Sequence, residues 1–155
     1  MDIISNRTKD ITAMALDGLY ERSKAISANT VNALTPNYQR KEVSFEGSLR
    51  EIIKREDEKE EMKLQNSAFF QKNPSEALKS KSPAELSFLA TETSQGFNID
   101  VEADMADPVD SDGNNVSIER EMMDEAKNGM QYQVLTNLMS KQYQQLKSVI
   151  TGQNS

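Results

Sequence analysis

The chain has 155 residues and a net charge of -7, with hydrophobic residues at 36% and charged residues at 28%. It has no cysteine, histidine or tryptophan. It therefore lacks soft metal ligands and the commonest general acid and base near neutral pH, which argues against an enzyme, a metal site or a bound cofactor. The acidic balance argues against nucleic acid as a partner. No apolar run is long enough to predict a membrane span, and the N-terminus does not resemble a cleavable secretory signal.

The first predicted element is an amphipathic helix over residues 4–33. Apolar or small residues recur there at intervals of four or seven, which places them on one stripe of a helix. The stripe starts at Ile4, and its helix-packing residues are Ile11, Ala15, Leu19 and Ile26. Because Pro36 disfavours the α conformation at Thr35, we expect the helix to end between Ala33 and Thr35.

A turn and an extended arm are predicted next, in the stretch NTVNALTPNYQRKEVSF. Pro36 fixes the exit of the chain, Asn37 tolerates a left-handed conformation, and Tyr38 can pack back on the helix. Alternation around Val43 predicts a short strand lying on the first helix. The two asparagines of the motif are expected to bond loosened backbone or a neighbouring subunit. The candidate residues of this assembly and turn motif are Asn29, Asn32, Thr35, Pro36, Asn37, Tyr38, Val43 and Phe45.

The middle of the chain, residues 46–110, is predicted to be variable and partly extended. Dense mixed charge and high helix propensity predict a solvated helix over residues 48–65. Residues 66–84 are typical of a loop, with a helical turn expected from Pro83 to Leu89. Alternation predicts a half-buried strand at residues 97–101. The chain thus divides into residues 1–45, 46–110 and 111–155.

The strongest helix prediction covers residues 117–151. The turn SDGNN precedes it, Ser117 is placed as the N-cap, and Gly152 supplies a stop. Its predicted packing residues are Ile118, Met122, Ala126, Met130, Val134, Leu138, Met139, Leu146 and Ile150. The predicted fold is mainly α, with the two terminal helices forming an antiparallel, coiled-coil-like pair and the middle supplying short helix and strand segments.

A calcium loop is an alternative interpretation of DPVDSDGNNVSIE. Asp110, Asp112 and Glu119 occupy the third, fifth and twelfth places of an EF-hand loop, with glycine at the sixth. The first place, however, is Pro108, which has no side-chain oxygen, and the eighth is the polar Asn115. A tight turn followed by a helix N-cap is therefore favoured over a calcium site.

The two end motifs together resemble the bacterial flagellar rod protein family, and among its members those of the proximal rod. The matching residues of the first motif are Asn29, Asn32, Thr35, Pro36, Tyr38, Val43 and Phe45. Those of the second are Asp112, Gly113, Asn114, Val116, Glu119, Tyr132 and Gln133. Asn37 replaces the glycine of the family's turn, and asparagine is the next-best residue at a left-handed position.

This resemblance implies a structural subunit of the rod, the drive shaft between the inner-membrane ring and the distal rod and hook. It also implies export through the flagellar type III system without a cleavable signal, and helical assembly. The implied partners are other copies of the chain, the rod proteins FlgC and FlgF, the FliE adaptor and the MS-ring protein FliF. A soluble helical adaptor or export chaperone, which would bind its client in a helix groove, is the alternative hypothesis.

Overall fold

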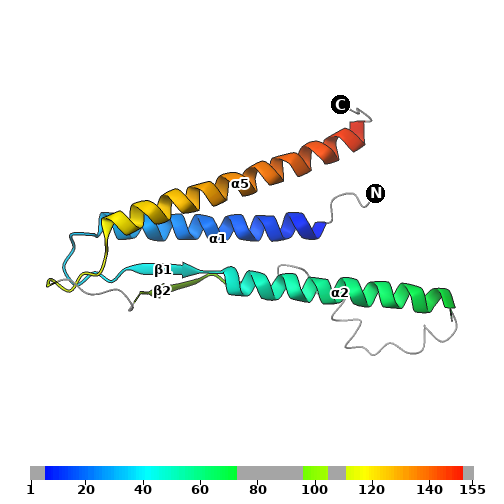
Figure 1. The fold of residues 1–155 in the computed structure, drawn as a ribbon, viewed down its shortest axis with the longest axis horizontal. Coiled ribbons are helices and arrows are strands. Elements are labelled where there is room, and N and C mark those ends of the chain that lie inside the picture. Colours follow the sequence, from blue (N-terminus) through cyan, green and yellow to red (C-terminus); the bar gives the residue numbers. More distant parts are fainter. Residues whose placement is uncertain (1–5, 73–95, 105–110, 152–155) are drawn as a thin grey trace.

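Three long helices and one small sheet make up the computed structural model, which describes residues 6–72, 96–104 and 111–151 (Figure 1). The helices are α1 (Asn6–Val31), α2 (Glu46–Lys72) and α5 (Ile118–Thr151), and the strands are β1 (Lys41–Ser44) and β2 (Asp100–Ala103). The predictions for Ile4, for residues 73–89, for Pro108 and Asp110, and for the stop at Gly152 lie outside the described residues. The mainly α fold is confirmed.

The two terminal helices form an antiparallel pair, as predicted. In Figure 1, α1 (blue) runs toward the turn at one end of the molecule, and α5 (yellow to red) starts at that end and returns along α1. The opposite side of α1 contacts β1 and α2. Helix α1 thus packs against both a helix and the extended arm.

The extended arm lies on α1, and its buried side chains form the centre of the core. Val43 and Phe45 are buried against Leu19 and Ala25 of α1. Strand β1 pairs antiparallel with β2, with Val43 opposite Val101. The half-buried residues packed around this core are Leu49, Phe97, Ile99 and Leu135. The arm is therefore held by the chain's own first helix.

Three boundaries differ from the predictions. Helix α1 ends at Val31, with turns over residues 32–34, a shift within the usual uncertainty of helix ends. Helix α2 continues to Lys72, so the predicted loop is wrong for residues 66–72, where the chain has no proline or glycine before Pro74. The predicted strand at 97–101 is found at Asp100–Ala103 with all four residues exposed, because Phe97 and Ile99 reach the core before the strand begins.

Most of the packing residues predicted on α5 are exposed in the single chain. Among the α5 side chains that the structure describes, the buried ones are Glu121, Asn128 and Gln142, spaced by seven and fourteen residues. Leu135 and Met139 are half-buried, as is Leu146, and the side chain of Ile150 lies outside the described part of the chain. The predicted positions that are exposed instead are Ile118, Met122, Ala126, Met130, Val134 and Leu138. A hydrophobic pattern shows only which face of a helix is apolar. In this chain the face of α5 that packs against α1 carries polar side chains, and it is held there by hydrogen bonds.

On α1 the predicted packing residues lie where the pattern placed them. Ala15, Leu19 and Ile26 are buried and Ile11 is half-buried. Two apolar grooves of about 400 and 500 Å³ border this stripe. The apolar α5 side chains along these grooves are Met130, Val134, Leu135 and Leu138. The exposed apolar residues of α5 thus lie along these grooves but do not fill them.

Candidate functional site

The turn after α1 has the geometry expected from its proline and asparagine. The Tyr38 amide donates to the Thr35 carbonyl at 3.2 Å, and Asn37 has φ 60°. Proline at the second position and positive φ at the third are the features of a type II turn. The left-handed conformation predicted for Asn37 is confirmed. The Asn37 amide also donates to the Asp112 carbonyl at 3.0 Å, which brings the SDGNN turn against this one.

Asn114 closes the C-terminal end of α1 from the far end of the sequence. Its Nδ2 donates to the carbonyls of Asn32, Ala33 and Thr35 at 2.9, 3.2 and 2.8 Å. Carbonyls that follow the last helical turn have no partner within the helix and need an external donor. The side-chain amide of Asn114, in the SDGNN turn, therefore supplies the hydrogen-bond donors that nearby backbone amides supply at a helix end capped by glycine.

Gly113 is needed for this contact between the two turns. It has φ 83°, and a Cβ built on it would collide with Asn37 Oδ1. Gln39 Nε2 donates to the Gly113 carbonyl at 3.0 Å. A residue with a side chain would be strained by both the backbone angle and the lack of space.

Asn29 ties α1 to the start of β1 and to α5. Its side chain is fully buried, and it exchanges two hydrogen bonds with the Lys41 backbone, accepting from the amide at 2.8 Å and donating to the carbonyl at 2.9 Å. It also donates to Glu121 at 3.2 Å and accepts from the Tyr38 hydroxyl at 3.2 Å. The side-chain amide thus imitates the backbone of a neighbouring strand, and Tyr38 packs back on the helix as predicted.

Asn32 has the simpler role of satisfying the backbone near the end of α1. Its Nδ2 donates to the Ala28 carbonyl at 2.8 Å, and its Oδ1 accepts from the Thr35 hydroxyl at 3.2 Å. This is the local bonding that was expected of the motif's asparagines.

Asn115 ends the two-stranded ladder. Arg40 and Asp104 lie opposite each other one step beyond the paired strands, and the Asp104 amide donates to the Arg40 carbonyl at 2.7 Å. The reciprocal bond of such a pair would join the Arg40 amide to the Asp104 carbonyl. Instead, the Asn115 side chain lies between them, accepting from Arg40 at 2.6 Å and donating to Asp104 at 2.5 Å.

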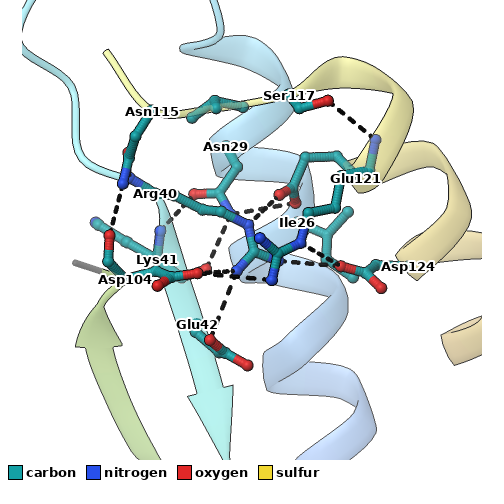
Figure 2. A network of polar contacts seen from close by, with 12 residues as sticks. Ile26, Asn29, Arg40, Lys41, Glu42, Asp104, Asn115, Ser117, Glu121 and Asp124 are labelled. Carbon is teal, nitrogen blue, oxygen red and sulfur yellow. Dashed lines mark hydrogen bonds and ion pairs between the residues drawn. The ribbon is translucent and has the colours of Figure 1, made fainter. Parts of the chain in front are cut away.

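Arg40 is the centre of a buried ion-pair network, shown in Figure 2. Only 4% exposed, it donates to Glu121 at 2.6 Å, Asp104 at 2.8 Å and Asp124 at 3.0 Å, with Glu42 at 3.6 Å. Burial alone would lower the pKa of Arg40, but its hydrogen bonds to Glu121 and Asp104 outweigh burial and raise it. One guanidinium therefore joins the arm, the end of β2 and the first turns of α5.

We call the set of these buried side chains the polar junction. It consists of Asn29, Arg40, Asp104, Asn114, Asn115 and Glu121. Sequence reasoning found Asn29 and the SDGNN turn but missed Arg40, Asp104 and the role of Glu121. The signal that could have revealed the network is the short basic run QRK, which leads into the arm. A basic side chain that becomes buried with the arm needs carboxylate partners.

The N-cap of α5 is confirmed. The Arg120 amide donates to Ser117 Oγ at 3.3 Å, which satisfies a free donor of the first helical turn. The Ser117 hydroxyl also bonds Glu119, whose pKa is lowered by its own backbone amide and by Ser117. Glu119 therefore lies in the capped first turn of α5.

The arrangement joins segments from the two ends of the sequence. Among the residues that the structure describes, no three His, Cys, Asp or Glu side chains gather closely enough to hold a metal ion. None of the described helices has an apolar stretch sufficient to cross a membrane. The polar junction instead locks both ends of the sequence into one unit, from which α5 projects with an apolar outer face.

Comparison with known proteins gives a consistent result over most of the chain. No family model matches. The chain is 30% identical over 131 residues to the flagellar basal body rod protein FlgB of Bacillus subtilis (strain 168), covering 84% of this chain and 83% of that protein. It is 29% identical over 141 residues to FlgB of Borrelia hermsii, covering 91% and 93% of the two chains. It is 26% identical over 140 residues to FlgB of Escherichia coli (strain K12), covering 90% of each.

Proposed function

The chain belongs to the FlgB family of flagellar basal body rod proteins, and on this basis we propose that it is a structural subunit of the proximal rod. In this role it forms part of the axial drive shaft between the inner-membrane ring and the distal rod and hook. It acts by packing and has no catalytic task. The flagellar basal body is its place in the cell, which it reaches through the type III export system.

The observation that carries this proposal is the set of exposed large apolar side chains on α5. Met122, Met130 and Val134 are 67%, 66% and 64% exposed. Large apolar side chains gathered on one helix face are typical of a surface that a partner covers. A subunit assembled with copies of itself and with other rod proteins would bury this face, whereas a free monomer leaves it in water.

The polar junction supports the same role. A shaft that transmits torque needs subunits that do not deform, and here one buried network fixes α1, the arm and α5 relative to one another. Buried polar networks in which every group is paired are rigid and specify one arrangement. By family resemblance, the proposed neighbours are copies of this chain, FlgC, FlgF, the FliE adaptor and the MS-ring protein FliF.

Fractionation of cells tests the proposal directly. Flagellar basal bodies would be purified with detergent from cells that carry the chain and from cells in which its gene is deleted, and an antibody against the chain would be used on each fraction. We expect the chain in the basal bodies and loss of swimming in the deletion. Confinement to the soluble fraction would instead support the adaptor or export chaperone, whose client could lie in the grooves beside α1.

A further inference from the structure

Asn128 and Gly129 form an asparagine–glycine pair within α5. Such a pair is chemically reactive, because the backbone nitrogen that follows an asparagine can attack the carbon of the side-chain amide. Glycine hinders this attack least, since it has no Cβ and its backbone adopts conformations that other residues avoid. Packing does not require glycine here, because a Cβ on Gly129 would meet nothing within 4 Å. The chain thus carries a reactive pair at a position where alanine would fit.

The folded chain keeps this pair from reacting. The Asn128 side chain is 4% exposed, and its Nδ2 donates to the Leu19 carbonyl of α1 at 3.0 Å. In a helix the Gly129 amide donates to the carbonyl four residues earlier, that of Glu125. The attack requires the Gly129 nitrogen to turn toward the Asn128 side chain, and the α conformation of the backbone holds it away. The two reacting groups are therefore kept apart as long as α5 is folded against α1.

We propose that Asn128 is a deamidation site that unfolding exposes and folding protects. In the unfolded chain the Gly129 nitrogen loses its proton to hydroxide and forms a bond to Asn128 Cγ. The bond from Cγ to Nδ2 then breaks, and the nitrogen leaves as ammonia. Water opens the resulting succinimide at one of its two carbonyls, which leaves aspartate or isoaspartate at position 128. The net reaction consumes one water and releases one ammonia, without an oxidant, a reductant or a cofactor.

The product does not fit the place that Asn128 occupies. An aspartate would replace the donor Nδ2 with a carboxylate oxygen facing the Leu19 carbonyl, so that two acceptors would meet in a buried position. The other oxygen would fare no better, since Asn128 Oδ1 accepts from no described residue. Arg22 and Arg40 line the cavity beside Asn128, but both already hold carboxylates. The reaction therefore opposes the return of α5 to α1.

The reaction gives the unfolded chain a limited lifetime. A folded chain reacts only through rare openings of α5, so the rate follows the population of the open state. Any step that keeps the chain unfolded, including the proposed export, lets deamidation proceed. The site goes beyond the proposed function and does not rest on it, because it depends only on the contact of Asn128 with Leu19 and on the residue that follows it.

Mass spectrometry of the digested chain tests the site. The full chain would be incubated at mildly alkaline pH with and without guanidinium chloride, and the matched control is Asn137, an exposed asparagine of the same helix that Leu138 follows. In denaturant we expect Asn128 to deamidate about tenfold faster than Asn137, and Gly129→Ala to remove the difference. Without denaturant, Asn128 should react at least about tenfold more slowly than with it. Equal rates at Asn128 in the two conditions, or equal rates at both asparagines in denaturant, would overturn the proposal.

The consequence for folding has its own test. By urea titration we expect Asn128→Asp to unfold at a lower concentration than Asn128→Ala, because it buries a charge as well as losing a hydrogen bond, and Asn137→Asp to match the original chain. A measurement without variants covers the case in which Asn128→Asp does not fold. The original chain is partly deamidated in denaturant and then diluted, and the folded fraction should be depleted of the modified peptide about tenfold. Equal modification of the folded fraction and the starting mixture, or an Asn128→Asp chain as stable as the original, would overturn the inference.

Discussion

Asn29 and Lys41 exchange two hydrogen bonds, one in each direction, between a helix side chain and the backbone of the arm. The Lys41 amide donates to Asn29 Oδ1 at 2.8 Å and Asn29 Nδ2 donates to the Lys41 carbonyl at 2.9 Å. Such a pairing normally joins two strands. Here it lets the arm leave a tight turn and lie directly along the helix that precedes it.

Replacing Asn29 should release the arm. Asn29→Ala leaves the Lys41 amide and carbonyl and the Tyr38 hydroxyl without their partner, and each buried polar group left unpaired costs about 1 to 3 kcal/mol. We expect the free energy of unfolding, measured by urea titration, to fall by about 2 to 4 kcal/mol. Asn137→Ala, at an exposed asparagine of α5, is the control. Equal stability of the two variants would contradict this role for Asn29.

Removing Arg40 should be the most damaging change in the polar junction. Arg40→Leu leaves Glu121 and Asp104 buried without their cation, and breaking a buried ion pair from one side costs about 3 to 5 kcal/mol. We expect loss of that size in urea titration, together with faster amide exchange in β1 and in the first turns of α5. Arg50→Leu, on the exposed face of α2, should change stability little. Unchanged exchange in Arg40→Leu would show that the network is not what joins the two ends.

Two glycines in helices should respond oppositely to alanine. A Cβ on Gly18 would overlap the ring of Phe45, so Gly18→Ala forces the arm away from α1 and should cost about 1 to 3 kcal/mol. Gly129 in α5 has open space around it, so Gly129→Ala should gain up to about 1 kcal/mol from helix propensity. The midpoint temperatures of thermal unfolding of the two variants test both expectations. A stabilised Gly18→Ala would mean that Phe45 does not dock against that glycine.

The arm should loosen in acid. Burial would raise the pKa of Glu46, but the hydrogen bond from Arg22 at 2.5 Å and the backbone amides of Glu46 and Phe45 outweigh it and hold that pKa below 4.5. A carboxyl group with a lowered pKa stabilises the fold above its unfolded pKa, and that contribution is lost as the pH falls through the folded value. Stability should therefore fall more steeply below pH 4.5 in the original chain than in Glu46→Gln. Glu51→Gln, on the same helix, serves as the control, and identical acid slopes for all three chains would refute the assignment.

The turn after α1 and the N-cap of α5 could be predicted from the sequence because each depends on residues that are close together in the chain. The turn at Pro36 and Asn37 and the cap at Ser117 follow from the conformational preferences of single residues, and the terminal helices follow from periodicity. The exposed apolar residues of α5 show what periodicity cannot predict. An apolar pattern tells which face avoids water but leaves open whether an intramolecular or an intermolecular partner covers it.

The polar junction could not be predicted from pattern because its partners are far apart in the sequence. Arg40 contacts Asp104 and Glu121 because the arm lies on α1 and α5 runs back along α1 in the folded chain. The buried Asn128 of α5, whose Nδ2 donates to the Leu19 carbonyl at 3.0 Å, is equally invisible to hydropathy. Polar and charged residues such as these usually lie on the surface of a protein. Only the folded structure shows that they are buried here.

The most direct test of the account is methionine oxidation, compared between the isolated chain and purified basal bodies. Met122, Met123 and Met130 are exposed in the isolated chain, whereas Met14 of α1 is buried and serves as the internal control. Exposed methionines oxidise to the sulfoxide under mild peroxide, and mass spectrometry gives the rate at each residue. The account predicts that the three α5 methionines oxidise quickly in the isolated chain and at least tenfold more slowly in basal bodies, with Met14 slow in both. Equal rates in the two states, or the absence of the chain from basal bodies, would contradict it.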